Sequence, residues 1–255
     1  MLDKKTIRHQ PFPEELWGNI EEQIQRIKKQ FAHPIAAFDV DGTLWDGDIA
    51  EHFFNYQILH RLLPDLPRDP WAHYISLMME KEETALIWLA QINKGQNLET
   101  VRNWTKECFL GLKKSMSLFK EQERFVGMLL KENFSVYFIS GSVQWAVEPL
   151  AEYFGIPADN VIGMRTEVVD GIITENPVLP LTWREGKIEA LLKKTNSQNP
   201  QICSGNSMGD FALLDSATHF RLAISSQPQN GRLVTSEKML QIEARKKGWL
   251  THSFV

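Results

Sequence analysis

Residues 35–48 read IAAFDVDGTLWDGD, and this stretch decides the fold that we expect. The apolar run Ile35–Phe38 leads directly into Asp39, and a second acid, Asp41, follows one residue later before Gly-Thr. A short apolar run without alternation is typical of a central parallel strand that is covered on both faces. Two carboxylates at the end of such a strand repel each other, so their pairing suggests that they share a cation and a phosphoryl group.

Other parts of the sequence alternate between short apolar runs and helical patterns. Strands are predicted at Ser135–Ile139, Gln201–Cys203 and His219–Ile224. Helices are predicted at Pro13–Gln30, Ser117–Glu132, Ser142–Phe154, Arg184–Lys194 and Asn206–Ser216. This alternation favours an α/β fold with a doubly wound, Rossmann-like parallel sheet, in which working residues lie at the carboxyl ends of the strands.

Residues 48–115 follow a different pattern, with helical periodicity only. Helices are predicted at Asp48–Leu62, Pro70–Met79, Glu82–Ile92 and Leu98–Phe109. We therefore expect an inserted helical cap domain at 48–115 and an α/β core domain made of 1–47 and 116–255. Later in the chain, Asp170-Gly171 between two β-rich arms predicts a hairpin.

Composition and charge exclude several classes of protein. With 43% apolar and 24% charged residues among 255, the chain is expected to be globular, and its net charge of −4 gives no basic surface for nucleic acid. The first residues lack the apolar run of a secretory signal, and no stretch approaches membrane-spanning length, so we expect neither feature. Cys108 and Cys203 lack metal-binding spacing, which favours buried thiols in a reducing compartment. We expect a cytoplasmic monomer or homodimer that binds neither nucleic acid nor membrane.

Asp39 and Asp41 suit phosphoryl transfer, which needs a nucleophile, neutralisation of charge and a proton donor for the leaving alkoxide. Asp39 would supply the nucleophile by forming an aspartyl phosphate, and it also offers an oxygen to Mg²⁺. Asp41 would supply the proton. Gly42 permits a turn where the chain leaves the strand, and the Thr43 hydroxyl is placed to orient a carboxylate. The alternative is an acidic surface turn without a catalytic role. The D-x-D-G pattern alone does not distinguish such a turn from an active site.

Two later motifs offer groups that bind phosphate. In VYFISGS, Ser140 presents its hydroxyl, with backbone amides following from Gly141, at a helix N-terminus, although a helix-capping serine gives the same pattern. In WREGKIEAL, Lys187 is a cation at a helix start, where the helix dipole disfavours it, so it is expected to face a bound anion. A solvated lysine is the alternative for Lys187, and it is the expectation for Lys193 and Lys194.

A third motif, CSGNSMGD, closes a strand with a glycine-rich turn that carries Asn206 and Asp210. With these motifs in order, the chain resembles the haloacid dehalogenase superfamily of phosphohydrolases, and its insertion is similar to the cap of the phosphoserine phosphatase branch. The resemblance implies that Asp39 is the nucleophile and a Mg²⁺ ligand. It implies that Asp41 is the general acid and base and binds the metal through its carbonyl. It also implies that the phosphoryl oxygens are bound by Thr43, Ser140, Gly141 and Lys187.

Asn206 departs from the family pattern, which usually has an acid at this metal-coordinating position. A carboxamide oxygen still ligates a hard cation, but it removes one negative charge from the site. Asp210 remains as a ligand, directly or through water. We therefore expect Mg²⁺ to bind through Asp39, Asp41, Asn206 and Asp210, with weakened affinity.

The segment LWDGDIAEHFF follows the catalytic turn and bears on the substrate. Asp48 and Glu51 form a D-x-x-E capping box, which explains both acids structurally. Alternatively, one of these carboxylates meets a cationic substrate group, as in phosphoserine phosphatase-like enzymes. Trp45 is the candidate wall of the substrate site, since tryptophan faces bind quaternary ammonium groups. The sequence of this segment is also similar to that of bacterial phosphocholine phosphatases. Trp88 and Trp104 differ from Trp45, because their helical spacing with other apolar residues predicts that they belong to the core of the cap.

Three functions remain open on the sequence alone. The first is a Mg²⁺-dependent phosphomonoesterase that acts on a small phosphorylated metabolite, with an amine-bearing ester as one alternative. The second is a phosphate-binding or regulatory protein on the same fold, with catalysis weakened by Asn206. The third is a phosphotransferase, which uses the same nucleophile but passes the phosphoryl group to an acceptor alcohol.

Overall fold

The computed structural model of the chain describes residues 9–226 and 233–255. Most of the N-terminal stretch in which no secretory signal was found therefore lies outside the described residues. The chain forms two compact units, which are described one at a time. Unit 1 comprises Met1–Asp46, Ser117–Tyr137 and Thr195–Val255, and unit 2 comprises Gly47–Met116 and Phe138–Lys194.

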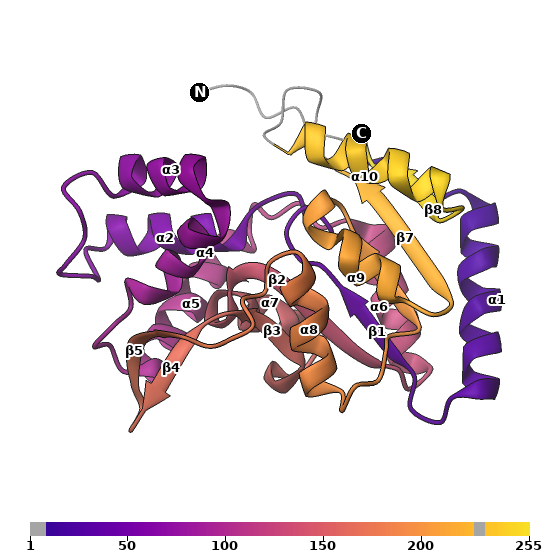
Figure 1. Ribbon diagram of the computed structural model, residues 1–255, viewed down its shortest axis with the longest axis horizontal. Helices are drawn as coiled ribbons and strands as arrows, with labels where there is room; N and C mark the ends of the chain where they lie inside the picture. The colour runs from indigo at the N-terminus through magenta and orange to yellow at the C-terminus, as the bar shows by residue number, and fades with distance from the viewer. Residues whose placement is uncertain (1–8, 227–232) are drawn as a thin grey trace. The chain divides into compact units, whose positions relative to one another are not determined.

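Unit 1 is built on parallel strands, β1 (Ile35–Phe38), β6 (Ile202–Gly205), β7 (Phe220–Ser225) and β8 (Leu250–Ser253), paired in that order (Figure 1). β2 (Ser135–Val143) begins in this unit, where the Ser135 amide donates to the Pro34 carbonyl at 2.8 Å. It continues in unit 2, where it pairs in parallel with β3 (Val161–Met164). The six-stranded sheet has the order β3-β2-β1-β6-β7-β8.

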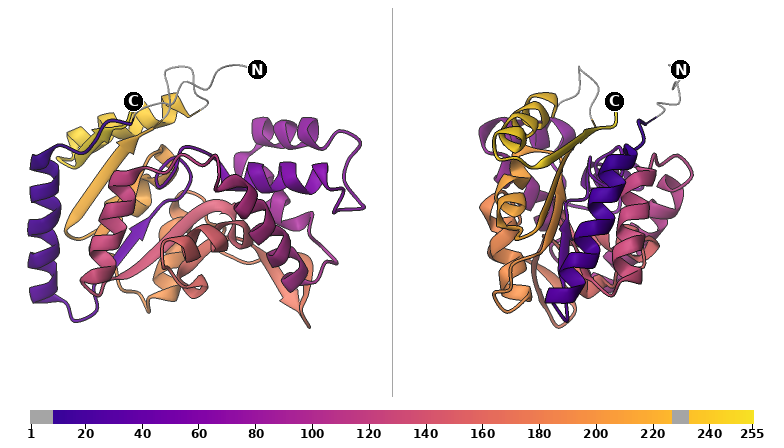
Figure 2. Two further views of the ribbon diagram at one scale, coloured as in Figure 1. Left: turned by 180° about the vertical axis from the view of Figure 1, so that it is seen from behind. Right: turned by 90° about the vertical axis from the view of Figure 1, so that its right-hand side faces the viewer.

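Helices cover both faces of the unit 1 strands. α1 (Glu14–Gln30) and α6 (Lys120–Lys131) lie on one face, and α9 (Phe211–Ser216) and α10 (Val234–Lys246) lie on the other (Figure 2, right). α1 buries a stripe at the 3.6-residue period, made by Leu16, Ile20, Ile24 and Ile27. All four residues of β1 are buried. The predicted doubly wound α/β fold is therefore confirmed, because covered faces are what such apolar strands require.

Unit 2 contains the helices of the predicted insertion. These are α2 (Ile49–Leu59), α3 (Pro70–Glu80), α4 (Glu82–Gln91) and α5 (Leu98–Leu112). The unit also contains α7 (Gln144–Tyr153), α8 (Glu185–Lys194) and the hairpin of β4 (Thr166–Val169) and β5 (Ile172–Pro177). Asp170 and Gly171 have φ values of 51° and 78°, as a two-residue hairpin turn with two left-handed positions requires. The predicted hairpin is confirmed, and the domain boundaries at 48 and 115 stay a prediction.

The structure contains elements that the sequence did not predict, namely β3, β8 and α10. It also shifts others: β2 extends to Val143 rather than ending at Ile139, so the helix predicted from Ser142 begins at Gln144 instead. The helix predicted at Asn206–Ser216 is a 3₁₀ turn, η2 (Met208–Asp210), followed by α9. Across the described ranges, no helix has the length and apolar character that a bilayer crossing demands.

Neither cysteine is suited to nucleophilic chemistry. Cys203 is buried in β6, and burial raises the pKa of its thiol well above the ordinary value. Cys108 is half-buried, and burial raises its pKa to about 11. The thiolate is the reactive form of cysteine, so both side chains are unreactive near neutral pH.

Candidate active site

Asp39 is the first residue after β1, and it is held at the carboxyl end of that strand. Its amide donates to the Ser204 carbonyl of β6 at 3.0 Å, and its side chain is only 5% exposed. The Thr43 hydroxyl donates to Asp39 Oδ2 at 2.9 Å. Thr43 reaches back because Gly42, at φ 72°, turns the chain there. The carboxylate of Asp39 therefore has a fixed orientation.

Asn206 lies at the end of the neighbouring strand, β6, and its side chain approaches the same threonine. Its Oδ1 is 3.3 Å from Thr43 Oγ1, so one hydroxyl contacts both Asp39 and Asn206. The backbone N–H of Asn206 donates to Asp210 Oδ2 at 3.1 Å. Asp210 also accepts from the amide of Ser207 at 3.0 Å, in a capping box that opens η2. One oxygen of Asp210 thus shapes the loop that presents Asn206.

Asp41 is held by a different neighbour, the indole of Trp45. Trp45 Nε1 donates to Asp41 Oδ1 at 3.0 Å, and the Trp45 carbonyl accepts from the Gly42 amide at 3.0 Å. Trp45 is only 1% exposed. The indole therefore orients the carboxylate expected to act as the acid, and the role of Trp45 as a substrate wall stays a prediction.

Glu237 is a residue that the sequence analysis missed. It lies on α10 with no exposed surface, and its Oε1 accepts from Asn206 Nδ2 at 2.9 Å. It also accepts hydrogen bonds from Ser225 and Ser226, at the end of β7. The sequence contained a clue to its burial. Glu237 has the helical spacing that places it on the same face as Leu240 and Ala244, which are apolar.

The donors of unit 1 fit a hard cation in type. The Asp39 carboxylate and the Asn206 carboxamide offer oxygen ligands, which Mg²⁺ and Ca²⁺ prefer, and both contact the same hydroxyl of Thr43. Within the described part of the chain there is no group of three or more histidine, cysteine, aspartate or glutamate side chains able to hold a metal ion. A carboxamide and backbone carbonyls would therefore have to complete the coordination.

Ser140 belongs to unit 2, and its surroundings correct one interpretation of the sequence. The residue lies within β2, which is irregular between Ile139 and Val143. Its hydroxyl accepts from the amide of Ser142 at 2.9 Å, in a local turn. Ser140 is therefore not the capping residue of α7, because Val143 occupies that position without a side-chain cap.

Lys187 lies in the first turn of α8 and is only 4% exposed. The alternative of a solvated lysine is therefore wrong for Lys187, whereas Lys193 and Lys194 are exposed as expected. The approach of the chain to α8 is tight. A side chain at Gly186 would place its Cβ 1.8 Å from the Leu181 carbonyl oxygen.

The acids of the insertion have structural partners inside unit 2. Asp48 is the N-cap of α2, with Oδ1 accepting from the Glu51 amide at 2.9 Å. Glu51 Oε1 accepts from the hydroxyl of Tyr74 at 3.4 Å. Trp88 packs edge-on against Phe54, with ring centroids 5.5 Å apart, as a core residue would. The capping role of Asp48 is confirmed, and the substrate roles of Asp48 and Glu51 stay predictions.

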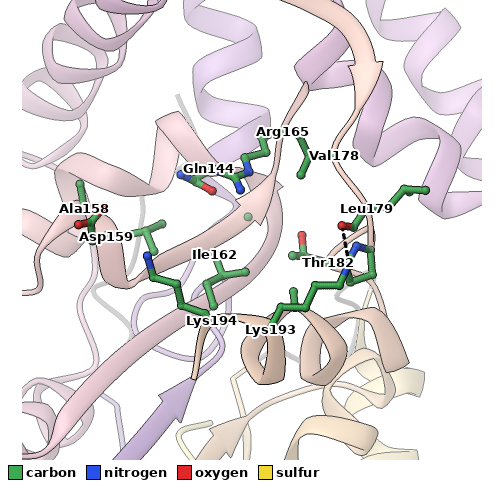
Figure 3. Close-up of a pocket in the computed structure, with 14 residues that line it drawn as sticks. Gln144, Ala158, Asp159, Ile162, Arg165, Val178, Leu179, Thr182, Lys193 and Lys194 are labelled. Atoms are coloured by element: carbon green, nitrogen blue, oxygen red, sulfur yellow. Dashed lines mark hydrogen bonds between the residues drawn. The ribbon is translucent and has the colours of Figure 1, made fainter. Parts of the chain in front are cut away.

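Unit 2 also contains a pocket of about 250 Å³ that none of the predicted site residues lines (Figure 3). Arg165, Lys193 and Lys194 bring positive charge to it, against a single acid, Asp159. Lys193 is already engaged, because its Nζ donates to the Leu179 carbonyl at 3.1 Å. The residues that line this pocket include none of the predicted site residues of unit 1 and none of those of unit 2.

Solved structures with the same fold come from several bacteria. A conserved protein of unknown function from Anaerococcus prevotii DSM 20548 matches with a TM-score of 0.73 and 17% identity, covering 98% of this chain and 97% of that one. A protein of unknown function from Bordetella pertussis Tohama I matches with a TM-score of 0.69 and 18% identity, covering 88% and 99%. A phosphoserine phosphohydrolase-like protein from Francisella tularensis matches with a TM-score of 0.51 and 16% identity, covering 82% and 92%. At these identities the likeness shows the fold.

A search of curated proteins finds no match to the sequence. The model of the family described as haloacid dehalogenase-like hydrolase matches residues 36–215, from β1 to the end of α9. That span contains the Asp39 turn, Ser140, Lys187 and the Asn206 turn. It also covers well over half of the 255 residues. The chain therefore belongs to the haloacid dehalogenase-like hydrolases, and the prediction of a hydrolase of this type is confirmed.

Proposed function

We propose that the chain is a Mg²⁺-dependent phosphomonoesterase that acts on a small phosphorylated metabolite. The observation that carries this proposal is the buried, oriented carboxylate of Asp39, fixed by Thr43 at the end of β1. A buried carboxylate with one oxygen held by a hydroxyl is pre-positioned for attack by the other, which lowers the entropic cost of the reaction. Family membership supports the same chemistry.

In the proposed reaction, an Asp39 oxygen attacks the phosphorus of the ester, and the bond between phosphorus and the ester oxygen breaks. The leaving alkoxide takes a proton from the carboxyl group of Asp41. A water molecule then attacks the phosphorus of the aspartyl phosphate and gives a proton to Asp41. Inorganic phosphate leaves, and Asp39 is regenerated. Asp39, the Asp41 carbonyl, Asn206 and Asp210 would hold Mg²⁺, which would supply charge neutralisation when bound.

Three further groups that the sequence predicts for phosphate binding belong to unit 2. Ser140, the backbone of Gly141 and Lys187 are proposed to bind the phosphoryl oxygens. The burial of Lys187 is consistent with this role, because it holds the cation within the protein rather than in bulk solvent. We further propose that the substrate is an amine-bearing phosphate ester. Trp45, Asp48 and Glu51 are the residues that would recognise its cationic group.

The test is phosphate release from a panel of phosphomonoesters, namely phosphoserine, phosphocholine, phosphoethanolamine and an aryl phosphate, with Mg²⁺ titrated. Asp39→Asn should lower Mg²⁺-dependent turnover at least about a thousandfold, because the nucleophile is removed. Asp215→Asn is the matched control, since Asp215 pairs with Lys247 on the surface. Turnover that survives in Asp39→Asn would contradict the mechanism.

Substrate preference and reaction type are decided in the same assay. The amine hypothesis fails if the choline and ethanolamine esters turn over no faster than the aryl phosphate. A wild-type protein that binds phosphate but releases none from any ester would instead favour the regulatory function. Added alcohols that accelerate loss of the ester without added phosphate release would identify a phosphotransferase.

A further inference from the structure

The side chain of Asn206 is held from behind by the carboxylate of Glu237. Both oxygens of Glu237 accept hydrogen bonds from other residues of unit 1. Oε1 accepts from Asn206 Nδ2 at 2.9 Å and from Ser226 Oγ at 3.0 Å. Oε2 accepts from Ser225 Oγ and from the amide of Ser226, both at 3.0 Å. Because Glu237 has no exposed surface, this orientation is set by the protein rather than by solvent.

The contact decides which end of the Asn206 carboxamide faces Glu237. A carboxylate only accepts hydrogen bonds, so the NH₂ group of Asn206 must point toward Glu237. Its Oδ1 then points the opposite way, toward Thr43 and Asp39. Asparagine oxygen and nitrogen have nearly the same shape, so without an acceptor such as Glu237 the reversed orientation would fit as well.

The Asn206 oxygen also keeps the capacity to bind a cation. Thr43 has a single hydroxyl proton, and Asp39 Oδ2 at 2.9 Å is both nearer and more basic than Asn206 Oδ1 at 3.3 Å. The proton is therefore directed to Asp39, because hydrogen bonds to charged acceptors are shorter and stronger. Asn206 Oδ1 makes only a weak contact with Thr43, which leaves its lone pairs available.

We infer that Glu237 is a positioning residue for the metal site, and that it turns the oxygen of Asn206 toward the cation. Glu237 also places a negative charge directly behind the neutral side chain of Asn206. The inference rests on the proposed function, because it assumes that Mg²⁺ binds beside Asp39.

Glu237→Gln is the informative variant, because its effect can be derived from the contacts. The amide of Ser226 cannot rotate, so the new carboxamide must keep its oxygen at the Oε2 position. Its NH₂ group then takes the Oε1 position and faces Asn206 Nδ2, which is also a donor. The Asn206 carboxamide is expected to reverse, which places NH₂ rather than oxygen on the side of Asp39.

The first measurement is Mg²⁺ binding by isothermal titration calorimetry, with no substrate present. Glu237→Gln should weaken binding by about tenfold to a hundredfold, as the loss of a group that orients a metal ligand does. Glu243→Gln is the matched control on the same helix, since Glu243 pairs with Lys246 at the surface. The double variant Asn206→Asp with Glu237→Gln exchanges amide and carboxylate, and it should bind Mg²⁺ at least as tightly as the wild type.

The outcomes separate this inference from the proposed function. A folded Glu237→Gln that binds Mg²⁺ as the wild type does, or a folded double variant that fails to recover binding, overturns the inference alone. A wild type that binds no Mg²⁺ overturns the proposed metal dependence, and the inference with it. A structural role for Glu237 alone would lower stability in the double variant without restoring the affinity for Mg²⁺.

A second measurement needs no variant. In uniformly labelled wild-type protein, Mg²⁺ should shift the nuclear magnetic resonance signal of the Asn206 side-chain carbonyl carbon. The matching carbon of Asn93 should not move, because that buried carboxamide accepts from Gln57 and donates to the α4 backbone in unit 2. An Asn206 carbonyl carbon that does not respond to saturating Mg²⁺ overturns the inference.

Discussion

The strand-end loops of unit 1 and the aromatic cluster of unit 2 are held by different forces. In unit 1, hydrogen bonds of 2.9 Å join Thr43 to Asp39 and Asn206 to Glu237, and Thr43 Oγ1 lies 3.3 Å from Asn206 Oδ1. In unit 2, Phe54 of α2 contacts the rings of three residues, Trp71, Tyr74 and Trp88, at centroid distances of 4.9–5.9 Å. Hydrogen bonds fix individual atoms, whereas ring packing fills volume. Substitutions in the loops should therefore change activity, and substitutions in the cluster should change stability.

The largest effect is expected from Phe54→Ala. Phe54 is 1% exposed and is the shared neighbour of the cluster, so its loss leaves a cavity among α2, α3 and α4. The free energy of unfolding should fall by about 3–5 kcal/mol. Urea denaturation measures this, with Phe54→Leu as a milder control. A loss below about 1 kcal/mol would mean that the cluster collapses around the gap, contrary to close packing.

Gly42→Ala should have the next largest effect, and it should act on catalysis. A Cβ at Gly42 would lie 2.2 Å from Asn206 Nδ2, so the carboxamide must shift from the position in which it donates to Glu237. Mg²⁺-dependent turnover should fall at least about a hundredfold, which corresponds to about 2.7 kcal/mol in the activation barrier.

Gly248→Ala is the matched control for Gly42→Ala. Gly248 has the same φ of 72°, but nothing lies within 4 Å of its Cβ position. It should therefore show only the cost of the left-handed backbone, about 1 kcal/mol in unfolding free energy, with normal turnover. Equal losses of turnover in the two variants would refute the contact with Asn206 as the cause.

Several residues of the candidate site can be predicted from the sequence, but Glu237, which holds the side chain of Asn206, cannot. Asp39, Thr43 and Asn206 are found because each follows an apolar strand, and parallel strands end at one edge. Glu237 is different, since its partners lie at positions 206, 225 and 226 and only folding brings them to α10.

Two of the elements missed by the sequence analysis, α10 and β8, lack an unbroken apolar pattern. α10 places Glu237 and Gln241 among its buried residues, so its apolar stripe is interrupted where the polar contacts lie. β8 reads LTHS, and it pairs with β7 without being fully buried, so it lacks the apolar run of a central strand. Hydrophobic periodicity identifies elements that are buried by apolar side chains, and it fails where hydrogen bonds hold a buried face.

Trp45→Phe should give a smaller effect that tests the loop contact by itself. Phenylalanine keeps an aromatic ring but loses the N–H group that donates to Asp41 Oδ1. The turnover number should fall about tenfold, since a hydrogen bond to an acidic group contributes about 1.5 kcal/mol, while KM changes little. Trp17→Phe is the control, a buried tryptophan of α1 that packs on Phe12. If KM for amine-bearing esters rises instead, Trp45 acts on the substrate.

The smallest effect is expected at Asp48, and it decides between the two roles left open for this acid. Asp48→Ala removes the acceptor for the Glu51 amide at the start of α2, so the free energy of unfolding should fall by about 1 kcal/mol. Asp48→Asn keeps an oxygen that caps the helix but removes the charge, so stability should be nearly normal. If Asp48 only caps α2, Asp48→Asn will also leave KM unchanged for phosphoserine and for an aryl phosphate alike. A rise in KM for the amine-bearing ester alone would show instead that the charge meets the substrate, because capping does not depend on which ester is bound.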